Sequence, residues 1–130
     1  MEKNTPTPIT YPFVNFLMEP TQGIGSTPTL IFGNENYACI IEGIIVASQV
    51  NNQLLFSLYF LREDDTVSPP VATEYMLTTN QTLTANESID WMHRKTIILQ
   101  PGDALFAYSD YSDNLFNTFV SYRELKELSA

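Results

Sequence analysis

The last third of the chain constrains the fold most strongly, because short apolar runs alternate there with turn signals. Residues 96–125 read TIILQPGDALFAYSDYSDNLFNTFVSYREL. The runs at residues 97–100, 105–108 and 116–122 are rich in β-branched and aromatic residues, which favour strands. Between the first two runs, Pro101-Gly102-Asp103 combines a fixed φ, tolerance of positive φ and a side chain that can bond its own backbone. The segment predicts an antiparallel meander, and these three residues are assigned to turn geometry only.

The middle of the chain adds further predicted strands. A long strand is expected at residues 37–50 and a return strand at residues 53–61, joined by the turn Asn51-Asn52. Because both faces of the return strand are largely apolar, this hairpin should lie centrally or be covered by a partner. Residues 62–70 are predicted as a loop, 73–77 as a short strand, 78–85 as polar turns, and 88–92 as a short strand with Trp91 buried.

These runs total about eight strands with almost no helix. That pattern predicts an all-β, antiparallel β-sandwich of jelly-roll or immunoglobulin-like topology. The chain has one cysteine, so it lacks the cysteine pair of a true immunoglobulin domain, and a jelly-roll-like sandwich is preferred. The predicted domain covers residues 27–130.

The first 26 residues are predicted to form an extended arm and a flexible connector. Prolines at positions 6, 8 and 12 exclude a helix or a central strand. An apolar patch follows, and it has two interpretations: an edge strand folded back on the sandwich, or an arm that docks on a neighbouring subunit. Under the second interpretation the partner-binding anchors are Tyr11, Phe13, Val14, Phe16 and Leu17.

Charge and composition narrow the classes of partner. Six basic and 15 acidic residues give a net charge of −9, which disfavours direct binding to nucleic acid. Residues 1–12 lack the apolar core of a signal peptide, and the longest apolar stretch, residues 40–50, is too short and polar to span a bilayer. Charged residues make up only 16%, which suits either a Thr-, Ser- and Asn-rich surface or a surface partly hidden in an assembly.

No motif for catalysis, a metal or a cofactor is evident, so we expect no enzyme activity, no metal and no cofactor. Cys39 lies in an apolar run and is expected to be a small buried hydrophobe. His93 is the single histidine, too few for the histidine set of a cupin-type metal centre. The acidic loop from Asp110 to Asn114 lacks the spacing of an EF-hand and is read as a solvated turn.

Two parts of the C-terminal third carry a resemblance to a known family. Leu99-Gln100-Pro101-Gly102-Asp103-Ala104-Leu105 and Val120-Ser121-Tyr122-Arg123-Glu124 resemble a pattern found in small β-sandwich structural proteins of tailed-bacteriophage virions. Residues 27–32, 38–48 and 56–61 would supply the upstream strands of that family. The resemblance covers residues 27–125 and leaves the first 26 residues unmatched.

The resemblance implies a non-enzymatic virion protein made in the bacterial host cytoplasm. The expected role is a capsid decoration or cement protein that binds neighbouring capsid subunits. A head-tail neck or tail ring protein is the first alternative. The expected partners are other virion proteins and further copies of the chain in a homo-oligomer, with no nucleic acid and no membrane. A carbohydrate-binding sandwich is a second alternative, because aromatic residues such as Tyr108, Tyr111 and Tyr122 could stack on sugar rings.

Overall fold

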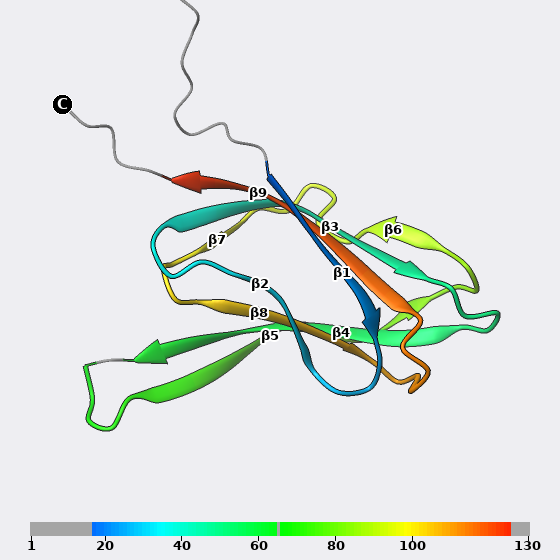
Figure 1. Ribbon diagram of the computed structural model, residues 1–130, viewed down its shortest axis with the longest axis horizontal. Helices are drawn as coiled ribbons and strands as arrows, with labels where there is room; N and C mark the ends of the chain where they lie inside the picture. The colour runs from blue at the N-terminus through cyan, green and yellow to red at the C-terminus, as the bar shows by residue number, and fades with distance from the viewer. Residues whose placement is uncertain (1–16, 65, 126–130) are drawn as a thin grey trace, which may run out of the picture.

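The computed structural model describes residues 17–64 and 66–125, which form nine β-strands and no helix (Figure 1). The strands are β1 (Leu17–Ile24), β2 (Thr29–Gly33), β3 (Ala38–Ser48), β4 (Leu54–Asp64), β5 (Val71–Leu83), β6 (Ser88–Asp90), β7 (Ile97–Leu99), β8 (Ala104–Ser109) and β9 (Phe116–Leu125).

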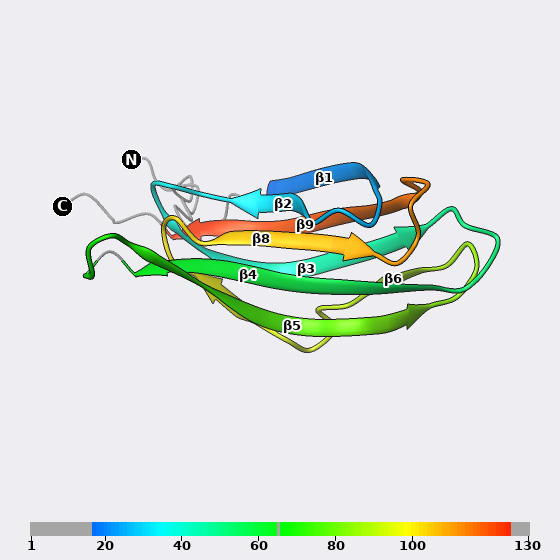
Figure 2. The ribbon, with the colours of Figure 1, turned by 90° about the horizontal axis from the view of Figure 1, so that it is seen from below.

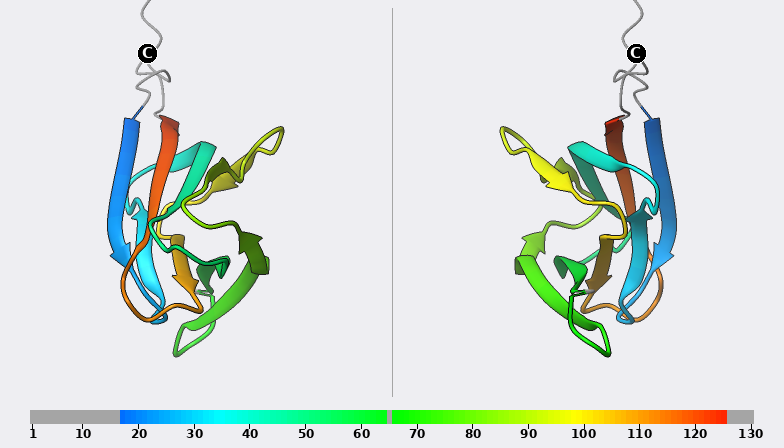
Figure 3. Two further views of the ribbon diagram at one scale, coloured as in Figure 1. Left: turned by 90° about the vertical axis from the view of Figure 1, so that its right-hand side faces the viewer. Right: turned by 90° about the vertical axis from the view of Figure 1, so that its left-hand side faces the viewer.

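The strands form two antiparallel sheets that pack face to face (Figures 2 and 3). One sheet has five strands in the order β1-β9-β3-β6, with β7 also paired to β3, and the other has four in the order β2-β8-β4-β5. Because β6 and β7 pair with two stretches of the same strand β3, they occupy one strand position that residues 91–96 interrupt. If β6 and β7 together count as position 6, then β8 is position 7 and β9 is position 8. The two sheets then have the orders 1-8-3-6 and 2-7-4-5, which is the strand order of a jelly roll. The prediction of a jelly-roll-like sandwich is confirmed.

The strand β5 differs from its prediction. We expected a short strand at residues 73–77 followed by polar turns at 78–85, but β5 continues to Leu83 and pairs with β4 along its length. Threonines are compatible with an extended backbone, and the register shifts twice opposite Phe56–Tyr59, which accommodates Asn80 at a positive φ of 49°. The predicted loop at residues 62–70 likewise begins too early, because β4 runs on to Asp64.

The boundary predicted between arm and sandwich also needs correction. Leu17–Ile24, placed with the arm and connector, form the edge strand β1, which pairs with β9. Ile24 is fully buried and belongs to the hydrophobic core. The sandwich therefore includes residues well before Thr27, because an apolar side chain at the end of β1 contributes to the core.

The core lies between the sheets and follows the alternation of side chains along each strand. On β8, Leu105 and Ala107 point inward, whereas Phe106 and Tyr108 lie on the outer face. Phe56 of β4 and Phe116 of β9 come from opposite sheets, and their rings stack with centroids 5.5 Å apart. Trp91 is buried, as predicted, and its Nε1 donates to Oε1 of Gln81 at 2.9 Å.

The stacked pair predicts a large effect of truncation. Phe116→Ala should lower the free energy of unfolding by about 3–5 kcal/mol, because it opens a cavity between the sheets. Ile98, which is 54% exposed on β7, supplies the control: Ile98→Ala should cost less than about 0.5 kcal/mol. Urea unfolding of the two variants and the parent measures both values, and equal losses would contradict this account of the core.

Candidate functional site

The turn between β7 and β8 is built as its sequence predicts. Gly102 has φ +88°, a conformation that glycine adopts without strain. The Asp103 backbone N–H donates to the Gln100 carbonyl at 3.0 Å, and Asp103 Oδ2 accepts from the Gln100 backbone N–H at 2.8 Å. The turn is therefore closed both by the backbone and by the side chain of Asp103.

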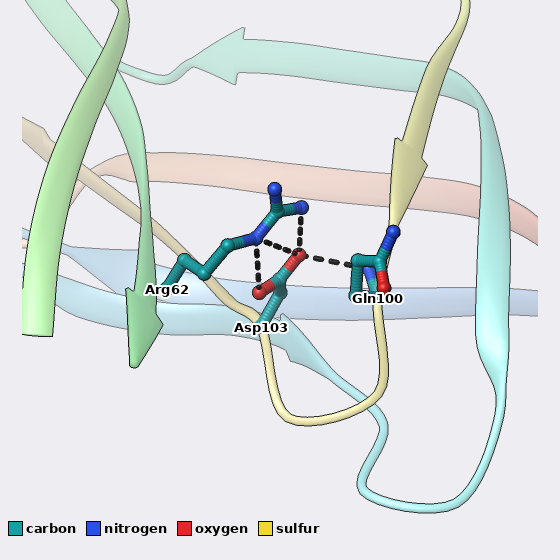
Figure 4. A network of polar contacts seen from close by, with 3 residues as sticks. All are labelled: Arg62, Gln100 and Asp103. Atoms are coloured by element: carbon teal, nitrogen blue, oxygen red, sulfur yellow. Dashed lines mark hydrogen bonds and ion pairs between the residues drawn. The ribbon is translucent and has the colours of Figure 1, made fainter. Parts of the chain in front are cut away.

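Asp103 also makes an ion pair that the sequence did not reveal (Figure 4). Arg62 Nη2 donates to Asp103 Oδ2 at 2.7 Å, and Arg62 Nε donates to Oδ1 at 3.0 Å. Asp103 is 3% exposed, whereas the side chain of Arg62 is 42% exposed. The pair thus joins the β7–β8 turn to the end of β4, although the two residues are 41 positions apart in the sequence.

The Arg62 guanidinium is held from two sides. Its pKa is raised above the usual value, first by the hydrogen bonds to Asp103, while partial burial opposes that rise. Its Cζ atom lies 5.5 Å from the centroid of the Phe60 ring, and the Phe60 ring stacks on Tyr75 at 5.0 Å. Arg62 therefore links the polar turn to an aromatic pair on the β4–β5 hairpin.

A cleft of about 810 Å³ opens beside this ion pair. Its walls come from the end of the β4–β5 hairpin, the β7–β8 turn and the β2–β3 turn; they are lined by Glu35, Leu61, Arg62, Glu63, Ala72 and residues 100–104. Both carboxylate oxygens of Asp103 already accept hydrogen bonds at the wall of this cleft. Asp103 therefore anchors the turn at the wall of the cleft.

The two halves of the family-like sequence pattern meet at this end of the sandwich. The Gly102 backbone N–H donates to the Asn34 carbonyl at 2.8 Å, and Asn34 Nδ2 donates to Glu124 Oε2 at 2.8 Å. Asn34 Oδ1 accepts from the backbone N–H groups of the next turn residues, Asn36 and Tyr37. The pattern residues Gly102, Asp103 and Glu124 thus stabilise this end of the fold.

The anchoring role of Asp103 leads to a prediction for a double-mutant cycle. Arg62→Leu leaves a buried carboxylate without its cation and should cost about 2–3 kcal/mol of unfolding free energy, since the guanidinium is partly solvated. Asp103→Ala should cost a similar amount because it also removes the acceptor for Gln100. The double variant should lose clearly less than the sum of the two. Additive losses in urea unfolding would show that the two side chains are not coupled.

The outer face of the four-stranded sheet carries a continuous apolar row. Leu30 of β2 pairs with Phe106 of β8, Phe106 with Tyr59 of β4, and Tyr59 with Met76 of β5. Residues directly opposite in antiparallel strands share a face, so these four side chains form one row across all four strands. We call this row, comprising Leu30, Phe106, Tyr59 and Met76, the outer strip.

The centre of the outer strip is closely packed, and its two ends are open. The Tyr59 ring stacks on Phe106 with centroids 5.2 Å apart and meets Tyr108 edge-on at 6.2 Å. Tyr59 is 7% exposed, whereas Leu30 and Met76 are 54% and 43% exposed. Burial raises the pKa of the Tyr59 phenol, with smaller contributions from Glu74 and Tyr108. The exposed apolar side chains at its two ends make the outer strip a candidate protein contact surface.

The outer face of the five-stranded sheet differs because an ion pair interrupts it. Arg123 Nη2 of β9 donates to Glu42 Oε2 of β3 at 2.7 Å. The exposed Ile98 and Met18 lie on β7 and β1, on the two sides of this pair. The outer strip is therefore the better candidate for an apolar contact.

The proposed arm anchors fall largely outside the structure. Tyr11, Phe13, Val14 and Phe16 lie outside the described residues. Leu17 is the first residue of β1, is half-buried and pairs with Tyr122 of β9. For Leu17, the position within an edge strand matches the interpretation of a segment folded back on the sandwich.

The remaining candidates for chemistry have structural partners. Asp110 Oδ1 accepts from the Leu55 backbone N–H at 2.9 Å, which ties the acidic loop to β4. Within residues 17–64 and 66–125, no group of three or more His, Cys, Asp or Glu side chains is arranged to hold a metal ion. Cys39 is 1% exposed, and burial raises the pKa of its thiol from 9.0 to about 11, with Glu124 adding to the rise.

The raised pKa of Cys39 predicts weaker folding at alkaline pH. The folded protein holds the thiol proton more tightly than the unfolded chain. The protonated thiol therefore contributes to the free energy of unfolding below pH 9.0, and this contribution is lost as the pH rises towards about 11. Tyr59 and Tyr122 also have raised pKa values, so the test compares variants. Between about pH 8 and about pH 10.5, Cys39→Ala should lose roughly 1–2 kcal/mol less unfolding free energy than the parent. Equal losses would contradict the assignment.

No protein-family model, curated protein or solved structure matches the chain. Among the described residues, no helix is long and apolar enough to cross a membrane.

Sequence reasoning missed two features of the candidate sites. The sequence pattern places Arg62 in a loop and gives no sign of its pairing with Asp103. The outer strip depends on the registers of three strand pairings, which one sequence does not specify. One signal for it was present, namely the apolar character of both faces of the strand that became β4.

Proposed function

We propose that the chain is a non-enzymatic structural component of a tailed-phage virion, acting as a capsid decoration or cement protein. The single observation that carries a binding role is the outer strip, an apolar row that crosses all four strands of one sheet. The virion setting is supported by the sequence resemblance described above. The jelly-roll strand order is compatible with it, since viral capsid domains use this fold, but lectins and cupins use it too.

The charge distribution favours protein over nucleic acid as the partner. The chain carries a net charge of −9, so its surface repels a phosphate backbone over distances comparable to the Debye length. A capsid subunit can instead offer an apolar patch to the outer strip. The exposed side chains at the ends of the strip, Leu30 and Met76, would then supply most of the apolar contact area, since Tyr59 at its centre is already covered within the sheet.

A neck or tail position is the first alternative, because the same surface could join copies into a ring. A carbohydrate-binding role is the second, and the cluster of Tyr59, Phe106 and Tyr108 favours it. However, Tyr59 is 7% exposed and one ring face is covered by Phe106. A sugar ring needs an open aromatic face, so a protein partner fits the cluster better.

The position in the virion can be tested directly by immunogold electron microscopy of purified particles with an antibody against this domain. Gold spread over the head supports a decoration or cement protein. Gold at one vertex or along the tail supports the neck or tail alternative. Unlabelled particles together with saturable binding on a glycan array would overturn the virion proposal in favour of a carbohydrate-binding module.

The role of the outer strip gives a matched pair of variants. Leu30→Lys combined with Met76→Lys places two charges on the open ends of the strip and should abolish association with particles. Because both side chains are exposed, unfolding free energy should change by less than about 0.5 kcal/mol for each. Ile98→Lys introduces a charge at an equally exposed position on the other sheet and should leave association intact. Loss of association in the control alone would refute the proposed contact face.

A further inference from the structure

The edge strand β5 is unusually open for its length. It has 13 residues, and among the described strands it pairs only with β4. The six residues from Val71 to Met76 are all exposed and pair with β4 in a regular register without a bulge. An edge of this kind presents unpaired backbone donors and acceptors to another strand.

The other described edge strands have features that hinder pairing with a further strand, such as proline, a register shift or a short length. This part of β5 lacks them. Strand β1 contains Pro20 and a register shift, β2 has five residues and a register shift, and β6 and β7 have three residues each. The segment Val71–Met76 reads VATEYM and contains no proline, lysine or arginine and one charge, Glu74. Its backbone is therefore available for strand pairing.

The β4–β5 hairpin also projects beyond the rest of the sandwich. Figures 1 and 2 both show its end extending past the β2–β3 and β7–β8 turns. Val71 and Tyr75 are 54% and 45% exposed there. The projecting end leaves apolar side chains uncovered next to an open edge.

We propose that β5 pairs antiparallel with β5 of a second copy of this chain, about a twofold axis at Thr73. In this register Thr73 lies opposite Thr73 of the second copy, and each Val71 lies opposite Tyr75. Both are favourable cross-strand pairs, a threonine pair and a β-branched–aromatic pair. The two β4–β5 hairpins then form one continuous four-stranded sheet. This inference does not depend on the virion role.

Symmetry and charge favour this register over the neighbouring one centred on Glu74. Residues that lie opposite each other must point to the same face of the sheet. Twofold symmetry then requires that the axis pass through a residue and not between two residues. An axis at Glu74 would place two carboxylates directly opposite each other, which is destabilising. With the axis at Thr73, Glu74 lies opposite Ala72, and both charges avoid a like partner.

The position of the axis also limits the repulsion between two chains of charge −9. Because Thr73 is near the projecting end of the hairpin, antiparallel pairing directs the two sandwiches away from each other. Pro69 and Pro70 precede Val71 and lack the backbone N–H needed to extend the ladder. The pairing therefore stays short and closes as a dimer, since a twofold contact uses the same surface on both copies.

Disulfide trapping in the full chain tests the register. In Thr73→Cys the two new thiols would lie opposite each other at a Cα separation of about 4.5–5.5 Å, which suits a disulfide. The native Cys39 is buried and does not compete. Mild oxidation should convert Thr73→Cys to a covalent dimer. The matched controls Glu74→Cys and Thr82→Cys, both exposed on β5, should cross-link much more slowly.

A second measurement keeps the inference testable without new cysteines. Light scattering after gel filtration should show a dimer of the parent protein that strengthens as salt screens the net charge. Thr73→Asp should be monomeric at concentrations where the parent is dimeric. A parent that stays monomeric at high concentration, or Glu74→Cys and Thr82→Cys cross-linking as fast as Thr73→Cys, would overturn the proposal. Particle labelling plays no part in these readouts, so the dimer and the virion role can fail separately.

Discussion

The apolar character of both faces of β4 is the constraint on which the arrangement depends. The inward face, with Leu54, Phe56 and Leu58, packs into the core. The outward face carries Tyr59, a large apolar side chain that is covered from the two neighbouring strands. Phe106 of β8 and Met76 of β5 lie opposite it. A strand of this kind must lie inside its sheet, and β4 lies between β8 and β5. The outer strip follows directly from this placement.

The end of the sandwich is organised by polar contacts. Asp103 closes its own turn and pairs with Arg62, while Asn34 joins the β2–β3 turn to both the β7–β8 turn and Glu124. Both oxygens of the Asp103 carboxylate accept hydrogen bonds in these contacts. The polar end therefore stabilises the fold, and the apolar sheet face remains the surface best suited to a partner.

Local sequence signals predicted much of the fold. The alternation around the Pro101-Gly102-Asp103 turn and the long apolar run of β3 specified these elements well, because their hydrophobic pattern and turn chemistry agree. The second half of β5 was not predicted, since threonines and Asn80 are equally typical of turns, and pairing with β4 decides the outcome. The start of the sandwich was placed too late because glycines around Ile24 suggested a connector.

The candidate sites were harder to foresee than the fold. The ion pair of Arg62 with Asp103 joins residues far apart in sequence, and the outer strip requires three strand registers at once. Neither follows from periodicity. For Tyr11, Phe13, Val14 and Phe16, the predicted role as anchors stays a prediction.

Methionine oxidation offers the most direct test of the central claim that the outer strip is a contact surface. Met76 lies in the strip and Met18 on the other sheet, and they are similarly exposed at 43% and 53%. Oxidation to the sulfoxide can be compared by mass spectrometry for the free protein and for the protein in purified particles. The account predicts that Met76 is protected in particles while Met18 still reacts. Equal oxidation of both residues in the two samples, or protection of Met18 alone, would contradict it.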